Sequence, residues 1–181
     1  MNLQKATFGG GCFWCTEAIF TAINGVTAVT SGYMGGAKPK PSYEEVCTGK
    51  TGHAEVIELL FDDTKISFQE LLLIFFKTHD PTTLNRQGGD TGTQYRSVVF
   101  YHTDLQKQQT AEIIDQLVEE KIFCNPIVTE VSTASTFYEA ENYHQNYFVN
   151  HRSQPYCMAV IEPKLGKFAE KFKEKIKPEL L

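Results

Sequence analysis

Gly9-Gly10-Gly11-Cys12-Phe13-Trp14-Cys15-Thr16-Glu17 joins an expected strand to an expected helix. Residues 6–8 are typical of a strand end, and residues 16–20 are typical of the beginning of a helix. The three glycines allow close approach of other backbone or of a ligand, because no Cβ intervenes. Cys12 is therefore expected at or beside a helix N-terminus, where free N–H groups and the helix dipole stabilise a thiolate. In such settings the pKa of a cysteine falls from ~8.5 to roughly 3.5–7.5, so we expect Cys12 to be a nucleophile.

A purely structural role is the alternative for Cys12, since free cysteines are often buried. Phe13 and Trp14 would then pack as ordinary core residues. The glycine run and a second cysteine three residues after the first favour a chemical role.

Length and composition predict an ordinary globular protein of one domain, residues 1–181. A net charge of −5 without a basic block argues against a surface for nucleic acid or for an anionic membrane. The N-terminal residues lack the apolar core of a signal peptide, and no segment approaches the ~20 apolar residues of a membrane span. Five cysteines, an odd number, indicate free thiols in a reducing compartment, so we expect a cytoplasmic protein.

Hydrophobic periodicity and turn residues divide the chain into alternating elements. Besides the strand that ends at Phe8, strands are expected over residues 26–33, 53–61, 96–102 and 127–131. Helices are expected over residues 13–23, 70–77, 105–121 and 136–150, followed by a last helix before Pro178. Ser67 and Glu70 form a capping box for the second of these helices.

Some of the expected strands are separated only by loops, which favours a mixed sheet over a doubly wound fold. The sequence therefore predicts an α+β fold, a two-layer sandwich with helices on one face of the sheet. Long irregular loops over residues 35–41 and 82–94 are where we expect function.

Cys12-x-x-Cys15 is compatible with a redox pair, with half of a zinc site or with coincidence. Zinc is disfavoured, because a structural site needs four ligands and the other cysteines stand alone. A thioredoxin-type exchange motif is a serious rival, although the strand before Cys12 is short and ends in glycines. Gly49-Lys50-Thr51 lacks the first glycine of a phosphate loop, and we reject that interpretation. Glu141-x-x-His144 is a single copy of a di-iron spacing, which we interpret as one face of a helix.

Four further residues stand in or beside the loops, and each also has a structural interpretation. Glu55 opens an apolar strand and is either an edge residue or a functional acid. Tyr43 and Tyr95 flank loops and are either core tyrosines or hydrogen-bond donors. Asp90, taken alone, is a turn residue.

Taken together, several stretches resemble the type A peptide methionine sulfoxide reductases from about residue 5 to residue 165. The stretches are Gly-Cys-Phe-Trp-Cys-Thr-Glu (11–17), Gly-His-Ala-Glu (52–55), His-Asp-Pro (79–81), Arg-Gln-Gly-Gly-Asp-Thr-Gly-Thr-Gln-Tyr-Arg-Ser (86–97) and Tyr-His-Gln (143–145). The resemblance implies a ferredoxin-like core in a single catalytic domain. It also implies reduction of the S-epimer of methionine sulfoxide, free or in proteins, with thioredoxin as the reductant. We expect a monomer that needs no metal or organic cofactor.

The resemblance also implies the roles of the site residues. Cys12 would be the nucleophile, and Phe13 and Trp14 would form the wall for the substrate methyl group. Glu55 would be the acid, Tyr43 and Tyr95 would bind the sulfoxide oxygen, and Asp90 would organise the site and the recycling cysteine.

The chemistry agrees with these roles, because a sulfoxide sulfur is a poor electrophile until its oxygen is protonated or strongly hydrogen-bonded. Attack by Cys12 leaves methionine and a sulfenic acid, which a second thiol converts to a disulfide. A disulfide oxidoreductase or a non-catalytic peptide-binding domain are the rival functions.

Many members of this family have glycine where Cys15 stands, so the resemblance does not identify the resolving cysteine. We expect Cys15, one helical turn from Cys12, to resolve first. Cys157, in a segment expected to be flexible, is the second candidate, with a Cys15–Cys157 relay as one route to the surface. Cys47 and Cys124 are expected to be structural core thiols.

Overall fold

The first strand, β1 (Leu3–Gly10), lies in the interior of the sheet and ends at the glycine run. It pairs antiparallel with β3 (Ala54–Asp62) on one side and with β6 (Ser97–Tyr101) on the other. Its last five residues are buried, as expected for a strand between two neighbours. The computed structural model describes residues 1–180.

Six strands form one mixed sheet in the order β7-β6-β1-β3-β2-β8. Only β6 and β7 run parallel; every other neighbouring pair is antiparallel. The strands not yet given are β2 (Val26–Met34), β7 (Glu130–Thr133), β8 (Tyr138–Glu139) and the separate hairpin of β4 (Arg86–Gln87) and β5 (Asp90–Thr91).

Helices and helical turns supply the rest of the regular structure. The α-helices are α1 (Phe13–Thr21), α2 (Tyr43–Cys47), α3 (Phe68–Thr78), α4 (Asp104–Glu119), α5 (Tyr147–Asn150) and α6 (Glu162–Lys171). The shorter turns are η1 (Thr93–Tyr95), η2 (Asn142–His144), the π-helical η3 (Cys157–Ile161), η4 (Lys173–Lys175) and η5 (Pro178–Leu180).

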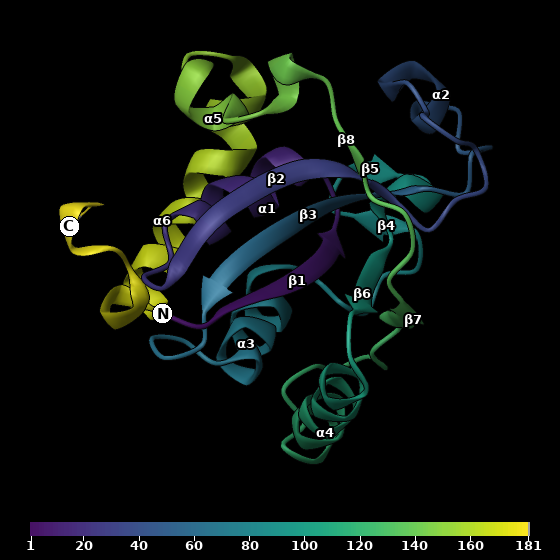
Figure 1. The fold of residues 1–181 in the computed structure, drawn as a ribbon. Coiled ribbons are helices and arrows are strands. Elements are labelled where there is room, and N and C mark those ends of the chain that lie inside the picture. The colour runs from purple at the N-terminus through teal and green to yellow at the C-terminus, as the bar shows by residue number, and fades with distance from the viewer. Residues whose placement is uncertain (181) are drawn as a thin grey trace.

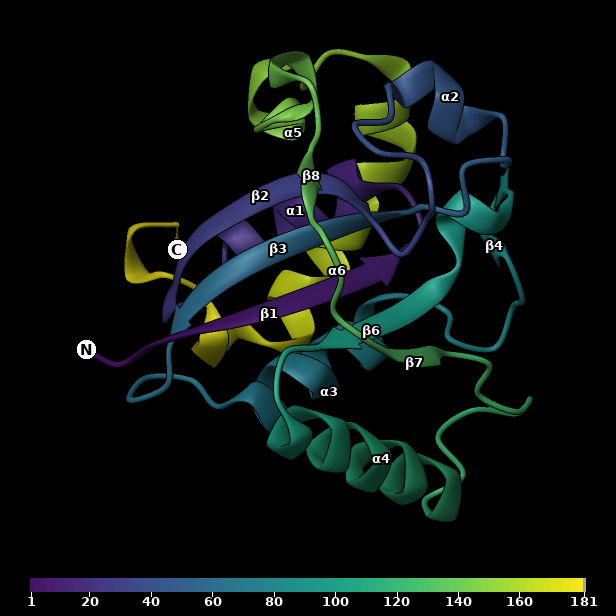
Figure 2. The same cartoon turned by 45° about the vertical axis from the view of Figure 1, so that its right-hand side comes forward.

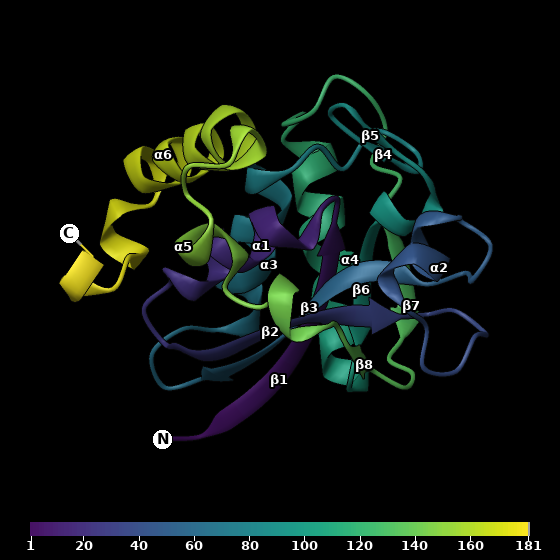
Figure 3. The ribbon, with the colours of Figure 1, turned by 90° about the horizontal axis from the view of Figure 1, so that it is seen from above.

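The two faces of the sheet are covered differently. α1, α3 and α6 lie on one side, where α1 contacts β1, β2 and β3 and α3 contacts β1 (Figures 1 and 3). α4 packs beside α3 and against β6 (Figure 2). The segment between β7 and β8 crosses the opposite face, where Phe137 packs against a small cluster that includes Met34 and Phe100 (Figure 1). The fold is therefore α+β with a mixed sheet, as predicted.

The topology brings the two principal candidate residues to the same end of the sheet. Because β1 and β3 are antiparallel, the last residues of β1 lie near the first residues of β3, where Glu55 stands. Gly11 then turns the chain with a φ of +91°, and a Cβ at this position would lie 2.6 Å from Gln87. Glycine is therefore required for the turn that leads from β1 to Cys12 and α1.

Most of the expected elements are present within two or three residues of their expected ends, and the capping box of Ser67 and Glu70 is confirmed at α3. Two short elements, one after the first expected loop and one within the second, were not predicted from the sequence. α2 follows the first loop with its own capping box, made by Ser42 and Glu45, and the β4–β5 hairpin lies inside the second.

The predicted helix over residues 136–150 is wrong. Tyr138 and Glu139 form β8 and pair with β2, and the chain then passes through η2 before α5 begins. Asn146 interrupts any continuous helix because it adopts a left-handed conformation, with a φ of 52°. Glu17 on α1 holds this break by accepting hydrogen bonds from the N–H groups of Asn146 (2.8 Å) and Tyr147 (3.2 Å). Tertiary contacts with β2 and α1 therefore override the local helical pattern.

Phe8 is the residue that joins β1 to the helices on this face. Its ring lies 4.9 Å from that of Phe75 and 5.5 Å from that of Phe20, and its side chain is fully buried. We predict that Phe8→Ala lowers the free energy of unfolding by about 3–5 kcal/mol, measured by urea denaturation. Leu105→Ala, at an exposed position on α4, is the control and should change it by less than about 0.5 kcal/mol. Equal effects of the two substitutions would contradict this description of the core.

Candidate active site

Cys12 stands at the N-cap of α1, as predicted. Its own carbonyl accepts the first hydrogen bond of the helix, from the Cys15 N–H at 3.1 Å, and its side chain makes no capping bond. The thiol is 9% exposed, so it is nearly enclosed at the end of β1.

Glu55 faces Cys12 from the beginning of β3. Its Oε2 accepts a hydrogen bond from the Phe13 N–H at 3.0 Å, and the residue is 1% exposed. Burial raises the pKa of Glu55 to about 8, and the negative charges of Asp90 and Cys15 add to this, while the Phe13 N–H works against it. The carboxyl group is therefore neutral at pH 7 and has a proton to give.

Tyr43, the first residue of α2, and Tyr95, the last residue of η1, are half-buried beside Glu55. Burial raises the pKa of both phenols above the usual value, and the charge of Glu55 raises them further. Both hydroxyl groups are thus protonated and able to donate hydrogen bonds at any ordinary pH.

Trp14 is fixed from several directions. Its Nε1–H donates to Nδ1 of His144 at 3.0 Å, and its ring stacks on Tyr147 with the centroids 3.7 Å apart. Because Nδ1 of His144 accepts this bond, the neutral imidazole carries its proton on Nε2. His144 stood in two of the quoted motifs, but neither indicated that it would accept a hydrogen bond from the buried indole N–H.

Three of the five cysteines meet at this end of the molecule. Cys12, Cys15 and Cys157 belong to one buried cluster, and Cys157 is fully buried in η3. The segment expected to be flexible is helical over residues 157–161, and Cys157 and Ile161 are its buried residues. Cys47 and Cys124 are exposed, which corrects their assignment as core thiols.

The predicted lowering of the Cys12 pKa is also wrong. Burial, a hydrogen bond donated to Cys15 and the charge of Glu55 raise the pKa of the Cys12 thiol well above its usual value. The same bond from Cys12 lowers the pKa of Cys15 to about 7 against the effect of burial. Because the two thiols share this hydrogen bond, the first negative charge belongs to the pair.

Asp90 lies in the β4–β5 hairpin, across the site from Glu55. Its Oδ2 accepts a hydrogen bond from the hydroxyl of Tyr156 at 2.8 Å, and the same hydroxyl oxygen lies 3.8 Å from Sγ of Cys15. The sequence analysis missed Tyr156, because its segment showed no periodic pattern and its position next to Cys157 was the only signal.

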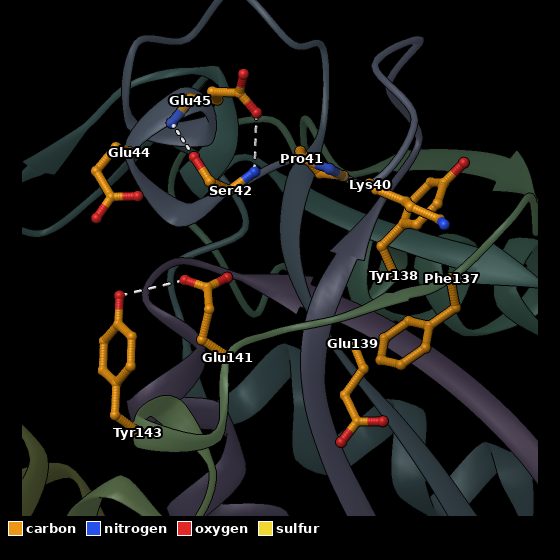
Figure 4. Close-up of a pocket in the computed structure, with 10 residues that line it drawn as sticks. All are labelled: Lys40, Pro41, Ser42, Glu44, Glu45, Phe137, Tyr138, Glu139, Glu141 and Tyr143. Atoms are coloured by element: carbon orange, nitrogen blue, oxygen red, sulfur yellow. Dashed lines mark hydrogen bonds between the residues drawn. The ribbon is translucent and has the colours of Figure 1, made fainter.

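A groove of about 650 Å³ lies outside the reaction centre, between residues 40–45 and residues 137–143 (Figure 4). Ser42 and Glu44, the neighbours of Tyr43, line one wall. Glu141 lies opposite and accepts hydrogen bonds from Tyr143 at 3.2 Å and from Tyr33 at 3.3 Å. Neither Cys12 nor Glu55 lines this groove, so the groove is separate from the enclosed centre.

Residues 4–176 match a family model described as peptide methionine sulfoxide reductase. The chain belongs to the peptide methionine sulfoxide reductase family. It is 55% identical to the peptide methionine sulfoxide reductase MsrA of Polynucleobacter asymbioticus over 178 residues, which cover 98% of this chain and 94% of that one. The family's activity makes the protein an oxidoreductase.

Solved structures of Mxr1 from Saccharomyces cerevisiae are also similar. The reduced form of Mxr1 has a TM-score of 0.78 and 35% identity, covering 86% of this chain and 89% of the yeast chain. Mxr1 in complex with Trx2 has a TM-score of 0.55 and 25% identity, covering 80% and 84% of the two chains.

No helix within residues 1–180 is long and apolar enough to cross a membrane. Over the same residues, no three or more His, Cys, Asp and Glu side chains are grouped to hold a metal ion.

The raised pKa of Glu55 predicts how stability depends on pH. Between ~4.3, its pKa in an unfolded chain, and about 8, the folded protein holds one proton more than the unfolded chain, so Glu55 makes stability fall as pH rises. We predict that Glu55→Gln, which cannot ionise, removes this loss. Between pH 5 and pH 8 the parent should lose on the order of 3 kcal/mol more than the variant in urea denaturation. Glu119→Gln, on the exposed surface of α4, should follow the parent, and identical pH dependence in all three proteins would show that Glu55 is ionised in the fold.

Proposed function

We propose that this reductase converts the S-epimer of methionine sulfoxide, free or in proteins, to methionine, with Cys12 as nucleophile and Glu55 as acid. One observation carries the proposal: a carboxyl group kept neutral by burial is held by the N–H of Phe13, the residue next to the Cys12 thiol. A sulfoxide requires a thiolate at its sulfur and a proton at its oxygen, and this pair offers both.

In the first step Glu55 protonates the sulfoxide oxygen, and Tyr43 and Tyr95 donate hydrogen bonds to it. Cys12 donates its hydrogen bond to Cys15, whose pKa of about 7 makes it the base that takes the Cys12 proton. The Cys12 sulfur then attacks the substrate sulfur. The substrate sulfur is reduced by two electrons, the Cys12 sulfur is oxidised by two, and the oxygen leaves the substrate and ends on Cys12 as a sulfenic acid.

Phe13 and Trp14 form the wall for the substrate methyl group. The bond from Trp14 to His144 and the stacking on Tyr147 hold the indole rigidly, which suits a pocket that admits a methyl group. Since Glu55, Tyr43 and Tyr95 meet the oxygen from one side, only one arrangement of methyl group and oxygen fits, and the R-epimer is excluded.

Cys15 then resolves the sulfenic acid, and Cys157 receives the disulfide from it. The shared buried cluster of the three cysteines supports this order, and so does the lowered pKa of Cys15. Asp90 organises the recycling cysteine through Tyr156. Thioredoxin is the reductant, which the complex of the related yeast protein Mxr1 with Trx2 supports.

The core fold, the number of domains, the partners and the cellular location also belong to what we propose for this chain. The segment β1-α1-β2-β3-α3-β6 with the strand order β6-β1-β3-β2 supports a ferredoxin-like core in a two-layer sandwich, and one sheet shared by both halves supports a single catalytic domain. A net charge of −5 supports a protein without nucleic-acid or membrane partners, and five free cysteines support a cytoplasmic location. We propose that it acts as a monomer and without a cofactor.

A thiol–disulfide oxidoreductase is the second candidate function. Cys12-x-x-Cys15 at the beginning of a helix, with the pKa of Cys15 near 7, favours it. Such an enzyme would reduce insulin-type disulfides and would not need Glu55.

The decisive experiment supplies peptides that contain either the S- or the R-sulfoxide, with dithiothreitol as reductant. We predict that the S-peptide is reduced and the R-peptide is not, because the oxygen donors lie on one side. Cys12→Ser should lower turnover to less than about a hundredth, since removing a nucleophile costs at least that much. Cys124→Ser, which changes an exposed thiol, should keep the parent activity. Consumption of both epimers, or residual turnover by Cys12→Ser, would contradict the assignment.

A second experiment identifies the resolving cysteine. With substrate in excess and no reductant, Cys15→Ser should still release one methionine per Cys12, because reduction precedes resolution. Its turnover with thioredoxin should collapse, and peptide mapping of the oxidised parent should find a Cys12–Cys15 disulfide. Cys124→Ser is again the control. Normal recycling by Cys15→Ser together with a Cys12–Cys157 disulfide alone would make Cys15 a packing residue.

A further inference from the structure

The hydroxyl group of Tyr156 lies between two residues that are distant in sequence. It donates to Oδ2 of Asp90 at 2.8 Å, and its oxygen lies 3.8 Å from Sγ of Cys15. A phenol has one proton to donate, and here that proton points to Asp90. The oxygen lone pairs therefore face Cys15, and a protonated Cys15 donates its S–H to them.

We propose that Tyr156 relays the proton of the Cys15 thiol to Asp90, so that Cys15 is a thiolate when the sulfenic acid forms on Cys12. This inference rests on Cys15 as the resolving residue. The need for a relay follows from the first step, in which Cys15 takes up the Cys12 proton and must lose it again before it attacks.

The relay keeps atoms and charge in balance. As the Cys15 proton moves to Oη of Tyr156, the phenolic proton moves to Asp90, so a thiolate and a neutral carboxylic acid replace a thiol and a carboxylate. Tyr156 then points its new O–H at the thiolate and stabilises it. Asp90 is half-buried, so its proton exchanges with solvent.

The thiolate of Cys15 next attacks the Cys12 sulfur. The S–S bond forms, the S–O bond of the sulfenic acid breaks, and the hydroxide that leaves takes up one proton to become water. Cys12 gains one electron and Cys15 loses one, so no further oxidant or reductant takes part.

Among the titratable groups around Cys15, Tyr156 and Asp90 are the route by which its proton leaves. The titratable groups that face it are Cys12, Glu55, Asp90, Tyr156, Cys157 and Lys164. Cys12 carries the sulfenic acid at this stage, and Glu55 accepts its hydrogen bond from the Phe13 N–H and not from Cys15. Cys157 is a buried thiol, and Lys164 has no vacant site for a proton when charged. The ring of Tyr156 packs edge-on against Trp14, with the centroids 5.7 Å apart, which holds the hydroxyl in place.

The test is the pH profile of resolution in a single turnover. Reduced protein is mixed with excess S-sulfoxide peptide without reductant and quenched between pH 5.5 and pH 9.5. Mass spectrometry then measures the methionine released, the sulfenic acid trapped by dimedone and the Cys12–Cys15 disulfide. The variants are Tyr156→Phe, which keeps the ring, and Asp90→Asn, which removes the proton acceptor. Tyr101→Phe, at the end of β6 and outside the site, removes a hydroxyl group as a matched control.

We expect Tyr156→Phe to shift the profile, and not merely to scale it. If the pKa of Cys15 rises by about one unit, the thiolate fraction falls ~10-fold at pH 6, while each thiolate becomes ~3-fold more nucleophilic. Disulfide formation should then slow about 3-fold at pH 6 and equal or exceed the parent rate at pH 9.5. Asp90→Asn should slow it in the same direction, and the double variant should be no slower than the slower single variant.

The results that would contradict these expectations differ in which part of the proposal they overturn. A profile for Tyr156→Phe that superimposes on that of the parent and of Tyr101→Phe, or is lowered equally at every pH, overturns the relay and leaves the proposed function intact. A parent that forms only a Cys12–Cys157 disulfide overturns the relay together with the resolving role of Cys15. A parent that releases no methionine overturns the proposed function itself. If Tyr156→Phe does not fold, the profile of Asp90→Asn decides the same question.

Discussion

The hydrogen bond from the Phe13 N–H to Glu55 is the contact on which the rest of the site depends. It joins the first residue of α1 to the beginning of β3. The thiol and the carboxyl group therefore keep a fixed separation. A charged Glu55 at this depth would lack enough partners, and burial therefore keeps it neutral. Burial also keeps the two phenols protonated around it, and the thiol pair, not the acid, carries the negative charge.

Sequence patterns identified what local chemistry determines. The glycine run predicted the strand-to-helix turn, and with it the position of Cys12 at the N-cap of α1. The capping box at Ser67 predicted α3 in the same way. Glu55 was different, because composition alone left it between a surface residue and an acid. Only the family resemblance gave it a role, which its burial supports.

What the sequence did not reveal depends on contacts between distant segments. The pKa of Cys12 could not be inferred from the helix dipole, because burial and Cys15 outweigh it. The pairing of Tyr156 with Asp90 spans 66 residues, and neither residue has a local pattern that indicates the other. Residues 136–150 have a helical sequence pattern. In the fold, however, Tyr138 pairs with β2, and the N–H of Asn146 donates a hydrogen bond to Glu17.

The hydrogen bonds from the N–H groups of Asn146 and Tyr147 to Glu17 hold a late segment of the chain on α1. They therefore affect the order in which a newly made chain completes its active site. The sheet strands β1, β2, β3 and β6 and the helices α1 and α3 are complete by residue 101, and they include both Cys12 and Glu55. The partners of Trp14 and Cys15, however, leave the ribosome about forty residues later or more, since synthesis runs from the N-terminus. During translation the nucleophile therefore stands for seconds in an unfinished, water-filled site. Docking of the last quarter of the chain onto α1 is the event that turns a reactive thiol into a selective one.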